Sequence, residues 1–421
     1  MTNTLVKRIR SAVGGEKLGK PYYKFLMVHT GFSIFTGLPS VFINTFLMSR
    51  TNRMDVVLVY NCLSFAGTAA GMLLSAGAVH RFQSGIVSVM GIIGFNLLYF
   101  ELMFFNAQAA RYVLLLGITN GLAGAFYWMS YSQLFTEFTG LGNRDSGLAI
   151  ISIMTSTVNL AAPLIAGAII TVVGGMSGYN VVFRIAFAIG IITAAAYMWL
   201  PKPQTSKGRA QHKLTYRYVH IHKAIFWSLI SECFKGIREG AFSFILTVML
   251  YQMIQSEMLA GVNTFLASGA SILSFLIISR RIKIANRLKY METSVFCLFL
   301  FGIILIFYIN PVILMVFTVI NAFFSGFITN SSFNTFLDSI QTFPDMNNFR
   351  PELFAEKEMY LAAGRCIGIF IIIFLDRISG GNFVWQAVSL IVLTLTQVGT
   401  LAACGHSMQL IKKASIARCG R

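Results

Sequence analysis

The feature that most constrains this chain is a succession of long apolar stretches separated by short polar segments. A helix needs roughly 20 apolar residues to cross a hydrocarbon core about 30 Å thick. Several of the loops are very short, so neighbouring helices are expected to be antiparallel. The pattern predicts an all-α integral membrane protein. Its twelve transmembrane helices are expected at residues 25–48, 54–79, 85–105, 112–134, 147–173, 179–200, 226–253, 258–279, 291–309, 312–337, 355–375 and 382–404.

The composition excludes an ordinary soluble fold. Of the 421 residues 56% are hydrophobic and 11% are charged, whereas about 25% are charged in a typical soluble domain. So much apolar surface cannot be hidden inside a globule that faces water. The solvent for much of the surface must therefore be the lipid bilayer, in which we expect the chain to be a monomer.

The distribution of positive charge indicates the orientation. If the N-terminus is cytoplasmic, 25 of the 33 Lys and Arg residues lie in or beside cytoplasmic segments and four lie in external loops. Cytoplasmic loops carry such an excess in multi-span proteins. The net charge of +18 is therefore a signal of topology and does not indicate nucleic-acid binding. We expect a protein of the inner (cytoplasmic) membrane with both termini in the cytoplasm.

The longest polar connection, residues 201–223, divides the twelve helices into six and six. It is basic, as expected of a loop on the cytoplasmic side. This division predicts two six-helix bundles. The N-terminal bundle would span 1–200, the basic cytoplasmic linker 201–223, and the C-terminal bundle with its basic tail 224–421.

Two short motifs carry a resemblance to a known family. The second helix is followed by Gly77-Ala-Val-His-Arg-Phe-Gln-Ser-Gly85, and the fifth contains Ala162-Pro-Leu-Ile-Ala-Gly167. With the six-plus-six plan, the chain resembles the major facilitator superfamily over essentially its whole length and is similar to an uncharacterised bacterial branch of it. The resemblance implies inward-facing and outward-facing states, with helices 1, 4, 7 and 10 around a central cavity. Arg81 matches a residue of the family's loop signature and is a gating candidate, whereas His80 replaces the usual aspartate.

Ionisable side chains are concentrated in the seventh helix. Each costs roughly 2.5–3.5 kcal/mol at the centre of a membrane helix, so it needs a partner or a wet cavity. Steps of three and four residues place Glu232, Lys235 and Glu239 on one face, where they can neutralise one another. Arg238 is left over and could bind an anionic substrate or pair structurally with another helix. Glu239 is a candidate proton-coupling carboxylate, because a low dielectric favours the protonated form.

The eleventh helix carries two further coupling or gating candidates, Glu358 and Arg365. They are seven residues apart and share one helix face. Either a latch between the two halves or direct contact with substrate would explain Arg365.

Polar residues form stripes on the fourth and tenth helices. An amide that faced hydrocarbon would be unsatisfied, so these stripes should face a cavity or another helix. Substrate binding and helix packing both fit this pattern. The candidate substrate-binding residues are Asn120, Tyr127, Tyr131, Asn330 and Asn334, together with Arg238.

An enzyme would require a clustered nucleophile, base or metal-ligand set, and none is recognisable in the sequence. We therefore expect no enzymatic activity, no metal and no cofactor. The combined features favour a secondary transporter that moves a small solute, amphiphilic or anionic, by alternating access, with proton-coupled efflux as one mode. The alternative is a transport-inactive membrane sensor or scaffold on the same fold.

Overall fold

The computed structural model describes residues 18–40, 42–139, 144–200, 211–282, 286–341, 349–379 and 383–419. Nearly all of these residues are helical, and no strand occurs among them. Twelve helical segments in this part of the chain are long and apolar enough to cross a membrane. Each overlaps one of the twelve predicted stretches, so the all-α membrane fold is confirmed.

The first six spans use eight helical elements. The first span is described as α2 and α3, on either side of residue 41, which lies outside the described residues, and a 3-10 helix precedes the fourth span. The elements are α2 (Lys20–Ser40), α3 (Phe42–Thr51), α4 (Met54–Arg81), α5 (Ser84–Phe105), η1 (Asn106–Tyr112), α6 (Val113–Phe138), α7 (Arg144–Val173) and α8 (Gly175–Met198).

The second six spans follow a short connecting helix, α9 (His212–Ile221). The seventh and twelfth spans are each made of two helices. The elements are α10 (Lys223–Phe242), α11 (Ile245–Ile254), α12 (Glu257–Arg281), α13 (Arg287–Phe307), α14 (Pro311–Gln341), α15 (Arg350–Ser379), α16 (Phe383–Leu395) and α17 (Gln397–Cys419).

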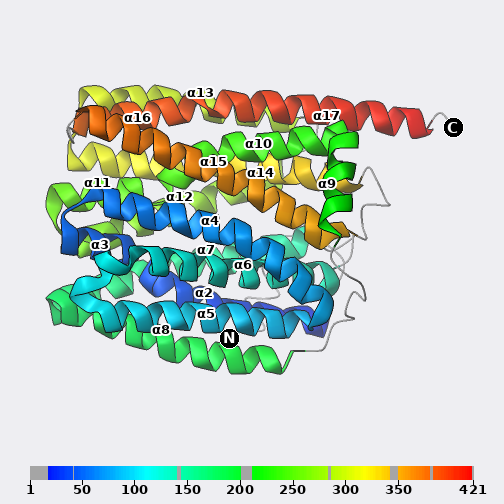
Figure 1. Cartoon of the computed structure of the whole chain (residues 1–421). Coiled ribbons are helices and arrows are strands. Elements are labelled where there is room, and N and C mark those ends of the chain that lie inside the picture. Colours follow the sequence, from blue (N-terminus) through cyan, green and yellow to red (C-terminus); the bar gives the residue numbers. More distant parts are fainter. Residues whose placement is uncertain are drawn as a thin grey trace.

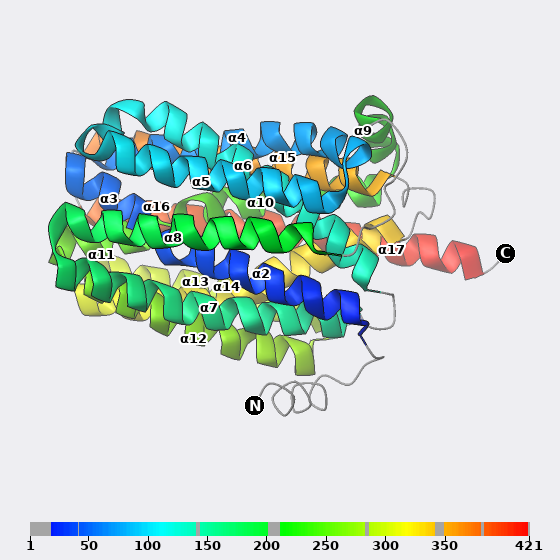
Figure 2. The same ribbon diagram turned by 90° about the horizontal axis from the view of Figure 1, so that it is seen from below.

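The long helices run side by side, and α9 lies across their direction at one end of the bundle (Figure 1). We call this the α9 end and the other the opposite end. Helix α2 begins and α17 ends at the α9 end, as Figure 2 also shows. The described chain therefore enters and leaves the bundle on the same side, as an even number of spans requires.

Packing between helices separates the chain into two groups. In the first half α6 packs on α4 and α5, and α2 packs on α7 and α8. In the second half α10 packs on α15 and α17, and α14 packs on α12 and α13. The halves meet where α4 packs on α15 and α7 on α12. The domain boundaries stay a prediction, because residues 201–210 lie outside the described residues. The helix α9 lies inside the expected linker and was not predicted from the sequence.

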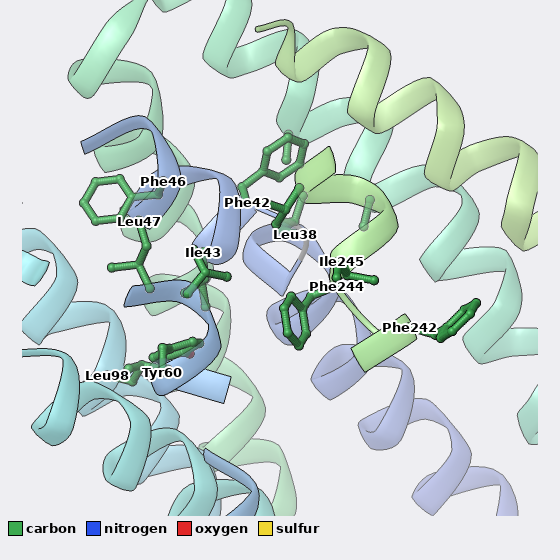
Figure 3. Close-up of a cluster of buried hydrophobic side chains, with 14 of the residues drawn as sticks. Leu38, Phe42, Ile43, Phe46, Leu47, Tyr60, Leu98, Phe242, Phe244 and Ile245 are labelled. Carbon is green, nitrogen blue, oxygen red and sulfur yellow. The ribbon is translucent and has the colours of Figure 1, made fainter. Parts of the chain in front are cut away.

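The first span of the second half is interrupted, because α10 ends before Ser243 and Phe244 and α11 begins at Ile245. In the first span of the first half, α2 and α3 flank residue 41, which lies outside the described residues. Apolar side chains from these parts of the first and seventh spans lie together near the opposite end, among them Leu38, Phe42, Phe244 and Ile245 (Figure 3). Residues of both halves therefore pack in one apolar cluster near the opposite end.

Helices α10 and α15 approach each other closely, and this contact positions most of the buried charges. A Cβ placed on Gly364 would overlap the backbone carbonyl of Cys233, and one on Gly368 would overlap that of Ile237. Only glycine allows two helix backbones to come so near. Charged residues on α10 and α15 are therefore brought within reach of one another.

Candidate functional site

Six charged residues on α10 and α15 form three ion pairs, and a fourth pair in the second half joins Arg287 of α13 to Asp338 of α14 at 2.9 Å. The first lies within α10, where Lys235 Nζ is 2.6 Å from Glu232 Oε2. Ser332 on α14 donates to the other oxygen of Glu232 at 2.7 Å. Both charged side chains are nearly inaccessible, and the pairing neutralises each of them. This pair agrees with the face predicted from the sequence.

Glu239 takes a different partner from the one expected. Its Oε1 accepts a hydrogen bond from Arg365 of α15 at 3.3 Å, so it does not complete a chain of charges within α10. The Arg365 guanidinium also lies 4.9 Å from the ring centre of Phe65 on α4. Arg365 therefore touches both halves of the molecule, as a latch between them would. The close packing of α10 on α15 overrides the helix-face pattern on α10 alone.

The third pair joins two neighbours on α15. Lys357 Nζ lies 2.6 Å from Glu358 Oε1 and 5.4 Å from the ring centre of Phe333 on α14. Glu358 is therefore matched by its neighbour on the same helix. The sequence analysis did not single out Lys357, because it counted this residue among the positive charges of the cytoplasmic segment before the eleventh helix. The side chain of Lys357 is only 8% exposed, so it belongs to the buried network.

Arg238 has no carboxylate partner among the described residues. Its guanidinium donates to the Asn321 side-chain oxygen on α14 and lies 4.1 Å from the ring centre of Phe242. Its Nε is buried and has no hydrogen-bond partner in the part of the chain that the structure describes. The three pairs above cancel their own charges, so Arg238 leaves the network with one positive charge. A role for Arg238 in substrate binding stays a prediction.

On α14, the tenth span, Arg238 contacts Asn321 and neither of the predicted residues Asn330 and Asn334. Asn330 and Asn334 lie nine and thirteen residues further along α14, which corresponds to about 14 and 20 Å along a helix axis. Both side chains are half-buried. The structure does not bring them to Arg238, and their role in binding stays a prediction.

The first half contains a buried chain of hydrogen-bonded rings. The Tyr127 hydroxyl on α6 lies 2.7 Å from His29 Nδ1 on α2 and 2.7 Å from the Tyr197 hydroxyl on α8. Thr155 on α7 lies 3.5 Å from the other nitrogen of His29. Four helices meet at this cluster, and Tyr127 is at its centre. Sequence analysis missed His29, although a histidine inside an apolar stretch is itself a signal.

Of the other two residues of the fourth-helix stripe, one joins this cluster. The ring of Tyr131 lies 4.6 Å from that of His29 and 5.3 Å from that of Trp128. Asn120 lies elsewhere, because its amide donates to the Ser64 hydroxyl on α4 at 2.7 Å. Helix packing accounts for this amide, and a role for Asn120 in binding stays a prediction.

The two halves also meet in a polar contact at the α9 end. His80 Nε2 at the end of α4 lies 3.2 Å from Glu352 Oε1 on α15. The same oxygen accepts the backbone N–H of Gln211, which precedes α9, at 3.0 Å. Arg81 is exposed at the end of α4. The cross-half contact at this loop is therefore made by His80, and gating by Arg81 stays a prediction.

These arrangements are suited to binding and movement of charge. Among the described residues no group of three or more His, Cys, Asp or Glu side chains is placed to hold a metal ion. The buried polar groups instead form one cluster inside each half, and Arg365 with Phe65 and His80 with Glu352 make contacts between the halves.

Comparison with known proteins gives the family. The family model for the Major Facilitator Superfamily matches residues 23–343. The chain belongs to the major facilitator superfamily. It is similar to the uncharacterised protein YqgE of Bacillus subtilis (strain 168), with 22% identity over 86% of this chain and 84% of that protein. A second similar protein, described as an uncharacterised protein in the sodM 3′ region of Geobacillus stearothermophilus, is 22% identical over 45% of this chain and 89% of its own length.

Solved structures of this superfamily share the fold. A mutant of the nucleoside transporter NupG matches with a TM-score of 0.65 and 13% identity, over 92% of this chain and 100% of its own. A D-xylose–proton symporter matches with a TM-score of 0.65 and 11% identity, over 90% and 96%. A bacterial homologue of the iron transporter ferroportin, in an outward-facing state with soaked iron, matches with a TM-score of 0.62 and 12% identity, over 94% and 99%. The chain is thus a multi-span membrane protein of the superfamily's transporter type.

Proposed function

We propose that this transporter carries a small amphiphilic solute with an anionic group, by alternating access between the two halves. The observation that carries the proposal is the uncompensated Arg238. Its guanidinium is nine-tenths or more buried and is held by an amide oxygen and a ring face. A buried cation is costly unless an opposite charge accompanies it. A carboxylate, sulfonate or phosphate on the solute would supply that charge, and the free Nε is a donor available to it.

The apolar part of the solute would lie against aromatic side chains. Tyr127 and Tyr131 belong to a ring-rich region of the first half, with Trp128 44% exposed beside them. Mostly apolar sites with a few polar anchors are typical of small-molecule binding. In this proposal Arg238 recognises the charge and the tyrosines of α6 contact the apolar body. Asn120, Asn330 and Asn334 are further candidates that could hydrogen-bond the solute in other states of the cycle.

Proton coupling would use the pair formed by Glu239 and Arg365. Glu239 has one oxygen on Arg365 and a second, buried oxygen without a partner among the described residues. Protonation of Glu239 would remove the charge that holds Arg365 and would loosen the contact of α15 with α10 and α4. Entry of a proton from outside could then drive the solute outward, so that efflux is the proposed direction. Glu358, paired with Lys357, is the second candidate for this step.

The proposed orientation places the α9 end in the cytoplasm of the cell, with the protein in the inner membrane as a monomer. The excess of Lys and Arg in the segments expected at this end supports it. Helix α9 itself carries Lys213 and Arg217, both exposed.

Binding is tested first, with ligands that differ only in charge. The purified protein is heated with benzoate, benzamide or benzylamine, and the unfolding temperature is measured for each. Stabilisation by the carboxylate alone is expected, and it should disappear in Arg238→Gln while persisting in Arg53→Gln, which changes an exposed arginine (67%). Equal shifts with all three compounds, or an unchanged benzoate shift in Arg238→Gln, would contradict the anion proposal.

Transport is tested next in proteoliposomes with a labelled compound that binds. We expect uptake or release above that of protein-free vesicles. The rate of solute movement should rise when protons flow down their gradient in the direction opposite to the solute. Binding without any transport would favour the sensor or scaffold alternative.

A further inference from the structure

Two cysteines from opposite halves face each other in the interface of α4 and α15. Cys366 Sγ on α15 donates a hydrogen bond to the backbone oxygen of Cys62 on α4 at 3.6 Å, which brings the Cys366 thiol next to the Cys62 residue. Both side chains are half-buried, and both are free thiols. The contact joins residues that are 304 positions apart in the sequence.

The surrounding contacts show that this is a point where the two halves meet. The Arg365 guanidinium, next to Cys366, lies over Phe65, one helix turn from Cys62. Further along the same two helices, His80 and Glu352 make the contact at the α9 end. Helices α4 and α15 are therefore antiparallel neighbours that touch at both levels. A bond between Cys62 and Cys366 would tie the two halves together at a level nearer to the opposite end than to the α9 end.

We infer that Cys62 and Cys366 form a site of oxidative modification, at which a hydroperoxide such as hydrogen peroxide produces an interhalf disulfide. One thiol attacks the peroxide oxygen and becomes a sulfenic acid, and one water is released. The second thiol then attacks the sulfenic sulfur, the S–S bond forms and a second water leaves. The two thiols lose two electrons and two protons in total, and hydrogen peroxide is reduced to two molecules of water.

The other cysteines with described side chains lack such a partner. Cys404 contacts the Thr335 hydroxyl at 3.1 Å, and Cys233 and Cys297 have no described sulfur neighbour. Reaction at any of these would stop at a sulfenic acid or a mixed disulfide with a small thiol. Oxidation should therefore yield one intramolecular bond within the described part of the chain.

Alternating access requires the halves to separate at one end and then at the other. A disulfide in the α4–α15 interface prevents separation on the side of the opposite end and holds the protein in one state. This consequence rests on the proposed transport function, whereas formation of the bond does not. The modification would act as a reversible lock.

Bond formation is tested without any substrate. A protease site is inserted between residues 201 and 210, membranes are treated with hydrogen peroxide, and the protein is cleaved and run on a denaturing gel without reductant. The two halves should stay joined and separate after addition of dithiothreitol. Cys62→Ser and Cys366→Ser should each separate without reductant, whereas Cys297→Ser should behave like the parent. Halves that separate after oxidation, or that stay joined in Cys62→Ser, would overturn the assignment.

The lock is tested by transport of a compound found to be a substrate. Oxidised protein in proteoliposomes should fall to the rate of protein-free vesicles and recover with dithiothreitol, whereas Cys62→Ser should be unaffected by peroxide. Full transport by cross-linked protein would overturn the lock. If no compound is transported at all, the proposed function fails, and the gel result still decides whether the disulfide forms.

Discussion

His80 Nε2 and Glu352 Oε1 lie 3.2 Å apart, and the side chains of the two residues are 5% and 2% exposed. They join the end of α4 to the first turns of α15, and Glu352 also accepts the backbone N–H that leads into α9. One carboxylate oxygen thus holds the first half, the connecting helix and the second half together. Near the opposite end, apolar side chains of both halves pack together instead (Figure 3). The two halves therefore meet through different chemistry near the two ends of the molecule.

Glu352→Gln and His80→Ala should each lower the unfolding temperature, because the first replaces a buried charged acceptor by a weaker neutral one and the second removes one of the two donors to Glu352. The expected cost is about 1–3 kcal/mol for each change. The double variant should lose less than the sum of the two, since the partners share one interaction. Thermal unfolding in detergent measures this, with the exposed Glu292→Gln as the control. Strictly additive losses would show that the two side chains do not interact.

Gly364→Ala should destabilise the protein strongly, because the added methyl overlaps the backbone of α10 and forces α15 away from it. Overpacking of this kind costs about 1–3 kcal/mol. Gly77→Ala is the matched control, because nothing lies within 4 Å of a Cβ at that position. Its unfolding temperature should stay the same or rise slightly, since alanine is the better helix former. Equal behaviour of the two variants would rule out the close approach of α10 and α15.

Glu239→Gln and Arg365→Gln should each cost about 1–3 kcal/mol, between the values for exposed and fully buried ion pairs. Combining them removes both charges and should recover part of the loss in the unfolding temperature. If Glu239 carries the coupling proton, Glu239→Gln should still exchange labelled for unlabelled solute across the membrane but should no longer respond to a proton gradient. Gradient-driven transport by this variant would exclude Glu239 as the coupling group.

Tyr127→Phe should destabilise the first half, because it removes the hydroxyl that links His29 to Tyr197. Two buried polar groups lose a partner, and each such loss costs about 1–3 kcal/mol. Tyr112→Phe makes the same chemical change at a side chain that is 36% exposed and should leave the unfolding temperature within a degree. The comparison isolates the buried hydrogen bonds from the change of residue type.

Cysteines placed at the two ends should report the orientation. On a background without other reactive thiols, Arg53→Cys at the opposite end should react with an impermeant thiol reagent in intact cells. Arg217→Cys on α9 should react only in inverted membranes or lysed cells. Both parent side chains are exposed, so access to the reagent is assured. Labelling of Arg217→Cys in intact cells would reverse the proposed topology.

The sequence by itself determined the number of spans and the family. A membrane helix must satisfy its own backbone and must reach across a layer of known thickness, so its signal is a local run of apolar residues. All twelve runs could be located in this way. The same reasoning identified Arg238 as the cation without a neighbour of opposite charge on α10, because neighbours within one helix follow from a spacing of three or four residues.

Only the tertiary structure decided which residues on different helices meet. Glu239 faces Arg365 because glycines let α10 and α15 approach, and Arg238 meets Asn321 instead of Asn330. The same is true of His29 with Tyr127, His80 with Glu352, and Cys62 with Cys366. The spacing of residues along one helix says which face a side chain is on. It does not say which helix covers that face or at what height, because both depend on the packing of the whole bundle.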